Sequence, residues 1–217
     1  MAGTDILIMT AVEAERDAVL RGLAGCPRAD VRLAGVGPAS AAARTAAALA
    51  AGGWRLVISA GIGGGFPGRA GIGELVLADV IAAADLGAET PDGFLTVDEL
   101  GFGTSRIPAD PVWSERLAQR IAAAGLPLRR GPVLTVSTAT GTAAAAAERA
   151  RRMPGAAAEA MEGFGVATAA AHAGVPVVEL RAVSNAVGPR DRAAWRIPDA
   201  LAALEAAFAA VKEVFES

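Results

Sequence analysis

The chain contains little of several residue types, and each shortage excludes a class of protein. Its 217 residues include a single cysteine, Cys26, so neither an internal disulfide nor a multi-cysteine metal site can form. The net charge is −3 without any block of like charges, which argues against the basic stripe of a nucleic-acid-binding protein. No apolar run reaches the roughly 18 residues that a membrane span needs, and the N-terminus lacks the basic segment of a secretory signal. We therefore expect a cytoplasmic protein that binds neither nucleic acid nor membrane.

Aromatic residues and histidine are also scarce. Aromatic residues make up 4% of the chain, whereas 53% is hydrophobic, and much of that is alanine, which favours closely packed helices. The only histidine, His172, precedes Gly174 in an alanine-rich segment, and we expect it to stabilise a helix end or to pack in the core rather than to catalyse. Cys26 is expected to be a half-buried small side chain rather than a nucleophile.

Apolar runs of strand type alternate with helical patterns along the whole chain, without a linker or an internal repeat. We expect one domain over residues 1–217, with a sizeable core. The alternation predicts a three-layer α/β/α sandwich around a mixed, largely parallel twisted sheet. The expected strands are 6–9, 31–34, 55–59, 74–84, 131–136 and 176–184. The expected helices are 12–23, an alanine-rich helix that follows residues 35–40 and ends near residue 51, 111–124, 142–152, 161–173 and 198–215; residues 91–111 are expected to be irregular.

Two carboxylates follow the first predicted strand. Thr10 and Glu13 have the spacing of a capping box, which gives Glu13 a structural role at the start of the helix. Glu15 lies further into the helix and has no capping role in this interpretation. From spacing alone, Glu15 is either a solvated helix carboxylate or part of a site at the strand end.

The glycine-rich segment 59–74 follows a predicted strand. A dinucleotide-binding loop is one interpretation, but Phe66 stands where the third glycine of the spacing is required, and no Gly-Lys-Ser/Thr follows. A glycine-rich turn that allows close approach of the backbone to a small ligand is the other interpretation, and we favour it.

Two polar groups flank the predicted segments at 161–173 and 176–184. Met161-Glu162 stands at the head of the helix and Asn185 follows the strand. Open α/β sheets bind ligands outside the carboxyl ends of their strands, so Glu162 and Asn185 are candidate ligand contacts. The structural alternatives are stabilisation of the helix dipole by Glu162 and capping of the strand end by Asn185.

These motifs resemble those of the nucleoside phosphorylase/nucleosidase superfamily, over nearly the whole chain. Its methylthioadenosine and adenosylhomocysteine nucleosidases have a Gly-Ala-Met-Glu-x-Glu turn that matches the turn containing Ala11, Glu13 and Glu15. The resemblance implies that Glu15 deprotonates the attacking water. The superfamily's phosphorylases carry Gly-Asp-Pro-x-Arg here, so the carboxylates imply water rather than phosphate as the nucleophile, unless Arg16 turns inward.

The resemblance also implies the substrate contacts. Met161 and Glu162 would hold the ribose hydroxyls, and the Glu162 carboxylate would stabilise oxocarbenium charge on the sugar. Ile62 stands where the family often has serine, which removes an anion contact and suits hydrolysis. The phenylalanine that stacks on adenine in the nucleosidases is missing, so Phe164 or Trp195 is expected to cover the base unless each is a core residue. The implied substrate-binding set is completed by Ala11, Gly61, Gly63, Thr140, Gly141 and Thr142.

Asn185 distinguishes the possible bases. The adenine-releasing nucleosidases have aspartate at this position, whereas an amide cannot act as a general acid but can pair with the O6 carbonyl of a 6-oxopurine. With segment 187–197 it resembles the futalosine hydrolases, which release hypoxanthine and dehypoxanthinyl futalosine in menaquinone biosynthesis and need no cofactor or metal. The candidates to bind the distal carboxylate of such a nucleoside are Arg190, Arg192 and Arg196.

The same resemblance implies a homodimer or larger homo-oligomer in which segment 94–107 completes the neighbouring pocket. Three other functions stay open at this stage. The first is a methylthioadenosine/adenosylhomocysteine nucleosidase or other purine nucleosidase, which Asn185 opposes; the second is a phosphorylase, which the first turn opposes. The third is a non-catalytic nucleoside sensor on the same fold.

Overall fold

The structure, a computed structural model, describes residues 3–216. Its strands are β1 (Ile6–Thr10), β2 (Ala29–Leu33), β3 (Leu56–Gly65), β4 (Leu75–Ala83), β5 (Gly87–Thr90), β6 (Gly93–Thr96), β7 (Arg106–Pro108), β8 (Leu128–Thr135), β9 (Ala158–Ala160) and β10 (Val177–Ala186). Its helices are α1 (Glu13–Leu23), α2 (Pro38–Leu49), α3 (Pro111–Ala123), α4 (Ala143–Arg152), α5 (Gly163–Ala173) and α6 (Ile197–Glu216), with a short 3₁₀ turn at Arg192–Ala194.

The main sheet is mixed and closes on itself. Its strand order is β10-β4-β8-β9-β3-β1-β2, and β7 pairs with β4. Because β3 also pairs with β10, the strands β3, β10, β4, β8 and β9 form a closed ring, from which β1 and β2 extend. Five of the pairings are parallel, and β3–β9, β4–β7 and β4–β10 are antiparallel. The predicted α/β fold with a mixed sheet is confirmed, but the sheet is a barrel with an extension rather than an open layer.

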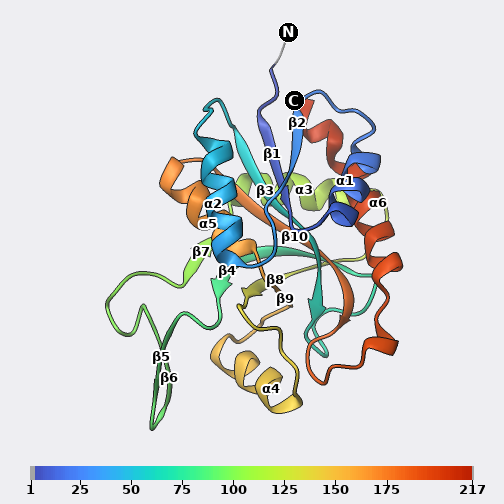
Figure 1. Cartoon of the computed structure of the whole chain (residues 1–217). Coiled ribbons are helices and arrows are strands. Elements are labelled where there is room, and N and C mark those ends of the chain that lie inside the picture. The colour runs from blue at the N-terminus through green and yellow to red at the C-terminus, as the bar shows by residue number, and fades with distance from the viewer. Residues whose placement is uncertain (1–2, 217) are drawn as a thin grey trace.

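Helices cover the sheet on two sides (Figure 1). One core joins α1, α3 and α6 to Ile6 and Ile8 of β1, and a second core joins α2 and α5 to Leu7 and Met9 of the same strand. Successive side chains of a strand point to opposite faces, so the fully buried β1 separates the two cores. Small residues bring α5 close to α2, since a Cβ at Gly165 would lie 2.1 Å from the Pro38 carbonyl oxygen.

The structure differs from the sequence prediction in three places. The glycine-rich segment is not a loop at first, because β3 continues through Gly61 to Gly65, where it pairs with β10 and β9. Segment 91–111 is not wholly irregular, since it contains β6 and β7. The three residues of β9 are too few to give a periodic pattern, yet this strand closes the ring between β8 and β3.

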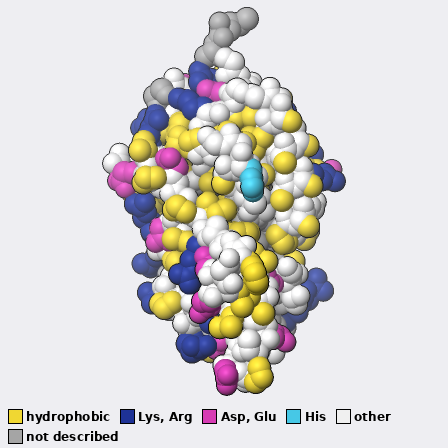
Figure 2. Space-filling view, turned by 90° about the vertical axis from the view of Figure 1, so that its left-hand side faces the viewer, with side chains coloured by type: hydrophobic (Ala, Val, Ile, Leu, Met, Phe, Trp, Pro, Cys, Tyr) yellow, Lys and Arg dark blue, Asp and Glu magenta, His cyan; other side chains and the backbone are white. Residues whose placement is uncertain are grey.

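The hairpin of β5 and β6 projects away from the body of the molecule (Figure 1). The loop after it carries Phe102, whose exposed fraction is 84%, and Leu86 and Leu95 of the projecting region are also exposed. Figure 2, which views the side at the left of Figure 1, shows hydrophobic side chains over the middle of that side and charged ones mainly toward its margins. Within residues 3–216, no helix has the length and apolar character needed to span a bilayer.

Candidate active site

A cavity of about 280 Å³ opens where β1, β8, β9 and β10 end and where the glycine-rich half of β3 passes. It brings together residues that are far apart in the sequence. The predicted site residues that line it are Ala11, Glu15, Ile62, Gly63, Thr140, Met161, Glu162 and Asn185, and Trp195 and Arg190 stand at the same cavity. Although β8 and β9 run in the opposite direction to β1 and β10, the closed sheet brings the carboxyl ends of all four strands to one cavity.

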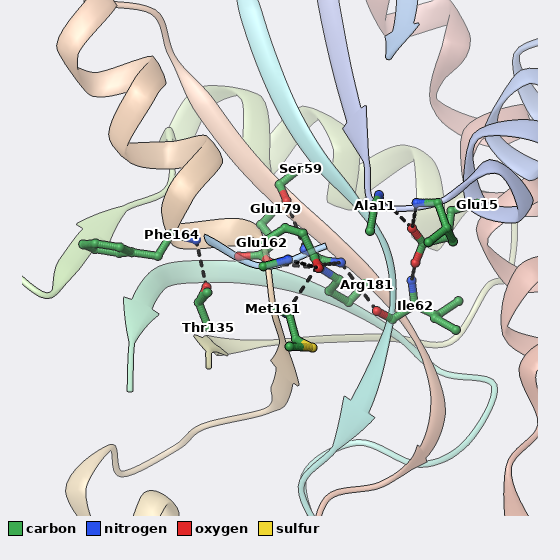
Figure 3. A network of polar contacts seen from close by, with 12 residues as sticks. Ala11, Glu15, Ser59, Ile62, Thr135, Met161, Glu162, Phe164, Glu179 and Arg181 are labelled. Carbon is green, nitrogen blue, oxygen red and sulfur yellow. Dashed lines mark hydrogen bonds and ion pairs between the residues drawn. The ribbon is translucent and has the colours of Figure 1, made fainter. Parts of the chain in front are cut away.

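Glu15 lines the cavity and is 3% exposed. Its Oε2 accepts hydrogen bonds from the backbone N–H groups of Ala11 (2.9 Å) and Val12 (3.2 Å), and its Oε1 accepts one from Ile62 N–H (2.9 Å). Figure 3 shows the carboxylate held between the first turn and β3. Three backbone donors thus fix both oxygens at the cavity wall.

The capping box of α1 is formed by Val12 and Glu15, and not by Thr10 and Glu13 as predicted. Val12 is the N-cap residue of α1, and Glu15, three residues later, bonds back to its N–H group. Glu13, predicted to cap with Thr10, has a side chain 75% exposed, and the Thr10 hydroxyl is buried without a partner within residues 3–216. Arg16 bonds to Asp17, 2.9 Å away, on the outer side of the helix. The prediction that Glu15 has no capping role was wrong, because the helix begins later than the Thr10 pattern suggested.

Arg181 of β10 is the centre of a buried ionic cluster. Its Nη1 donates to Glu162 Oε2 (3.2 Å), its Nε to Glu179 Oε1 (2.8 Å) and its Nη2 to Ser59 Oγ (3.1 Å). Figure 3 shows the guanidinium between these groups and Glu15. A Cβ at Gly61 would come within 2.6 Å of Glu15 Oε1 and 2.8 Å of Arg181 Nη1, so Gly61 supports the cluster from behind and does not line the cavity.

Glu162 connects this cluster to the cavity. It is the N-cap residue of α5 and 6% exposed. Its Oε1 accepts from Gly37 N–H (3.3 Å) and its Oε2 from Met161 N–H (3.3 Å), besides the bond from Arg181. Backbone bonds and the arginine hold the carboxylate in one orientation, which is what simultaneous binding of two sugar hydroxyls requires.

The cluster has more negative than positive charge, since Glu15, Glu162 and Glu179 surround one arginine. Burial raises the pKa of Glu15 above its ordinary value, against the lowering effects of Arg181 and of the Ile62 N–H group. Burial also raises the pKa of Glu179, whose Oε2 has no hydrogen-bond partner among the described residues. A carboxylate whose pKa is raised in this way is a better proton acceptor from water than an exposed one.

Asn185 brings an amide to the wall of the same cavity. Asn185 follows a bulge at Ser184, where the pairing of β10 with β3 shifts by one residue. The Asn185 Oδ1 accepts from the Ser184 hydroxyl (2.8 Å), and its Nδ2 donates to the Ala186 carbonyl (3.0 Å). The bulge turns the amide toward the cavity, and the serine fixes its orientation.

A second, smaller ionic group stands beside Asn185. Glu159 of β9 is 7% exposed and lines the cavity, although it was not among the predicted site residues. Its Oε1 accepts from Thr140 N–H (2.8 Å), and its Oε2 accepts from Arg149 Nη1 (2.9 Å) and from the Thr140 hydroxyl. Through these bonds the loop 137–142 is attached to β9.

Besides Gly61, three predicted contact residues lie outside the cavity lining. Phe164 packs against the α2–α5 core, its N–H bonds to the Thr135 hydroxyl (2.8 Å), and Figure 3 shows its ring pointing away from the cluster, so Trp195 is the aromatic at the cavity. Thr142 caps α4 by accepting from Ala145 N–H (3.1 Å), and Gly141 beside it is exposed. Local capping and helix packing therefore use residues that the resemblance assigned to the base pocket.

The structure also gives the positions of the candidate arginines, of the histidine and of the cysteine. Of the three arginines proposed for a distal carboxylate, only Arg190 lines the cavity, and its guanidinium carbon lies 5.5 Å from the centre of the Trp195 ring. His172 is exposed in the last turn of α5, and Cys26 is half buried against the α1–α6 core. Residues 3–216 contain no cluster of side chains that could hold a metal ion.

Sequence reasoning assigned no role to Arg181, Glu179 or Glu159. A signal was present for the first two, since Glu179 and Arg181 alternate within an otherwise apolar strand and so share one face. Charged residues in a buried strand are rare unless they are paired, which makes such a pair a candidate site. Glu159 could not be found because its three-residue strand was not predicted.

Comparison with known proteins identifies the family of the chain. The family model described as "Phosphorylase superfamily" matches residues 14–216. A futalosine hydrolase from Streptomyces coelicolor is 56% identical, over 98% of this chain and 97% of its own length. A futalosine hydrolase from Acidothermus cellulolyticus is 53% identical, over 94% of this chain and 89% of its own length.

Solved structures share the fold at low identity. The native structure of futalosine hydrolase from Helicobacter pylori matches with a TM-score of 0.84 and 16% identity, covering 97% of this chain and 98% of that one. A methylthioadenosine/adenosylhomocysteine nucleosidase from Neisseria meningitidis matches with a TM-score of 0.81 and 19% identity, covering 99% and 100%. With the sequence matches, these findings show that the chain belongs to the phosphorylase superfamily and, within it, to the futalosine hydrolase family.

Proposed function

We propose that this chain hydrolyses the N-glycosidic bond of futalosine, giving hypoxanthine and dehypoxanthinyl futalosine, as a cytoplasmic step of menaquinone biosynthesis. The observation that carries the assignment of roles is that Glu15, Glu162 and Asn185, from three distant segments, line one cavity. Identity of 53–56% with two futalosine hydrolases supports the substrate.

In the proposed reaction, water attacks C1′ of the ribosyl group and the C1′–N9 bond breaks, with its electron pair leaving on the base. Glu15 accepts the proton of the water, and its raised pKa suits that role. Glu162 binds the ribose hydroxyls and stabilises the positive charge that develops on the sugar. The excess of carboxylates around Arg181 favours a developing cation and disfavours an anionic nucleophile such as phosphate.

Asn185 is proposed to bind the departing base. Its amide can donate to N7 or to the O6 carbonyl of hypoxanthine, which stabilises the electron pair left on the purine. An amide has no acidic proton, so Asn185 assists by hydrogen bonding and not as a general acid. Trp195 is the proposed stacking partner, and Arg190 beside it is the proposed contact of the distal carboxylate of the substrate.

We also propose that the active form is a homodimer or larger homo-oligomer. The projecting β5–β6 hairpin and the exposed Phe102 leave apolar surface that a second copy of the chain can cover. Measurement of the mass in solution by light scattering tests this proposal, and a monomer at working concentration that retains full activity contradicts it.

The direct test of the reaction is incubation of the purified protein with futalosine while hypoxanthine is followed by an oxidase-coupled assay. We expect hypoxanthine release at a rate that does not depend on phosphate. No release at micromolar enzyme contradicts the proposed function. Adenine release from methylthioadenosine in its place supports the nucleosidase alternative, and a rate that requires phosphate supports a phosphorylase.

A further inference from the structure

Glu159 is a buried carboxylate to which the proposed reaction gives no role. It lines the cavity and belongs to neither the first turn nor the Arg181 cluster. Burial of a carboxylate is costly unless it is paired, and Arg149 and Thr140 supply that pairing. An apolar residue would fill the same place in β9 without this cost, which suggests that the carboxylate has a function at the cavity wall.

The register of the sheet places Glu159 beside Asn185. Gly64 of β3 pairs with Glu159 on one side and with Asn185 on the other. Directly opposed residues point to the same face of a sheet, and a Cβ at Gly64 would lie 3.3 Å from Asn185 Nδ2. Because Gly64 has no side chain, the carboxylate and the amide face the same space from its two sides.

The bonds of Glu159 leave it able to accept one more. Each carboxylate oxygen can accept two hydrogen bonds, and Oε1 accepts one, from Thr140 N–H, among the described residues. The Arg149 guanidinium and the Thr140 hydroxyl occupy Oε2 and fix the plane of the carboxylate. The remaining acceptor position is therefore oriented by Arg149 and Thr140, of which Thr140 itself lines the cavity.

We infer that Glu159 determines base specificity by accepting the N1–H of a 6-oxopurine; this rests on the proposed function. Hypoxanthine presents an N1–H donor next to its O6 acceptor, which matches a carboxylate next to an amide. Adenine presents an unprotonated N1, so that two acceptors would face each other without a proton between them. A site that leaves buried polar groups unpaired rejects the wrong base strongly.

The test compares Glu159→Gln with the wild-type protein by calorimetric binding of the free bases. We expect hypoxanthine to bind at least about tenfold more weakly to the variant, because a hydrogen bond to a charged acceptor is lost. Adenine is expected to bind equally well or more tightly, because the new amide can donate to N1. Glu148→Gln, the same change on exposed α4 outside the cavity, should alter neither affinity.

Other outcomes overturn the inference. If Glu159 only attaches the loop 137–142 to β9, its substitution loosens the pocket and weakens both bases by the same factor. Unchanged affinity for hypoxanthine also contradicts the inference. Should the variant fail to fold, binding of 1-methylhypoxanthine to the wild-type protein decides, since it lacks the N1–H; binding equal to that of hypoxanthine refutes a contact at N1.

Failure of this inference is distinguishable from failure of the proposed function. Futalosine hydrolysis by the wild-type protein tests the function, whereas the affinities of the free bases test Glu159 without turnover. A protein that releases hypoxanthine from futalosine but loses both bases equally on Glu159→Gln retains the function and refutes the specificity role.

Discussion

Two groups of carboxylates and arginine stand at the cavity, and they differ in proportion. At the first, called the sugar end after its proposed role, three carboxylates surround Arg181, whose side chain is 1% exposed. At the second, called the base end after its proposed role, one carboxylate, Glu159, pairs with Arg149, whose side chain is 14% exposed. The excess of carboxylates at the sugar end suits the cation and the deprotonated water of the proposed reaction, whereas the balanced pair at the base end suits the proposed recognition of a neutral base by hydrogen bonding.

Glu15→Gln should give the largest effect, since it removes the proton acceptor at the sugar end. We expect kcat to fall about 10²–10⁴-fold, while binding of free hypoxanthine, which the base end provides, stays unchanged. Steady-state kinetics and calorimetry measure the two quantities. Glu13→Gln, at the exposed neighbouring carboxylate, should change neither; an equal loss of turnover in both variants would refute the assignment, and a sensor would have no turnover to lose.

Arg181→Met tests the charge excess through stability. Without the guanidinium the buried carboxylates lose their counter-charge, and we expect the free energy of unfolding to fall by about 3–5 kcal/mol. Arg151→Met, at a guanidinium that pairs with Glu148 and is 71% exposed, should leave it nearly unchanged, because solvent screens an exposed ion pair. Urea unfolding followed by circular dichroism measures the free energy of unfolding of both variants. Similar decreases in the two would show that the buried carboxylates do not depend on the charge of Arg181.

Asn185→Asp tests recognition of the base, because it replaces the amide by a carboxyl group that can act as a general acid. An aspartic acid can donate a proton to N7 of adenine but repels O6 of hypoxanthine when ionised. We expect the ratio of kcat/KM for the 6-amino analogue of futalosine to that for futalosine to rise by roughly tenfold. Coupled assays for adenine and hypoxanthine measure it, and an unchanged ratio would mean that Asn185 does not contact the purine edge.

The pH dependence gives the smallest effect and has opposite signs for activity and stability. Glu15 must be ionised to accept a proton, so kcat/KM should rise as pH rises through its pKa, which burial holds above 4.5. The same raised pKa makes the folded state bind the proton more tightly than the unfolded state. The free energy of unfolding should therefore fall as pH rises from 4.5 to the raised pKa, by at most about 1.4 kcal/mol per pH unit.

Comparison with Glu15→Gln checks this pH dependence. The variant should lose the acidic limb of the kcat/KM profile in its residual activity, and it should lose that part of the pH dependence of unfolding. A wild-type profile that is flat from pH 4.5 to 7 would contradict the raised pKa.

The sequence predicted the elements whose signals are local. The fully buried β1 and the amphipathic α1 follow from periodicity, and the positions of Glu15, Glu162 and Asn185 at strand ends follow from the order of elements. The ring closure could not be predicted, because it depends on pairing of the glycine-rich half of β3 with both β9 and β10. Glycine runs carry no alternation, so they give no sign of a strand.

The residues that line the cavity were predicted where residue type and position at a strand end agree, and they were missed where tertiary contacts decide. Thr142 has the residue type of a pocket hydroxyl but is used as a helix cap, and Phe164 is taken up by the packing of α5 on α2. Conversely, Glu159 is brought to the cavity by the short strand β9, which only the closed sheet explains.

Gly61 makes the sugar end intolerant of even the smallest substitution. A methyl group at this position would occupy the space of the Glu15 and Arg181 side chains, at 2.6 Å and 2.8 Å from their polar atoms. Displacing them would move the Glu15 carboxylate from the position that the proposed reaction requires, so an alanine at this position should abolish the proposed activity. Random mutagenesis should therefore recover Gly61 among the positions at which function is lost although no catalytic group has been removed.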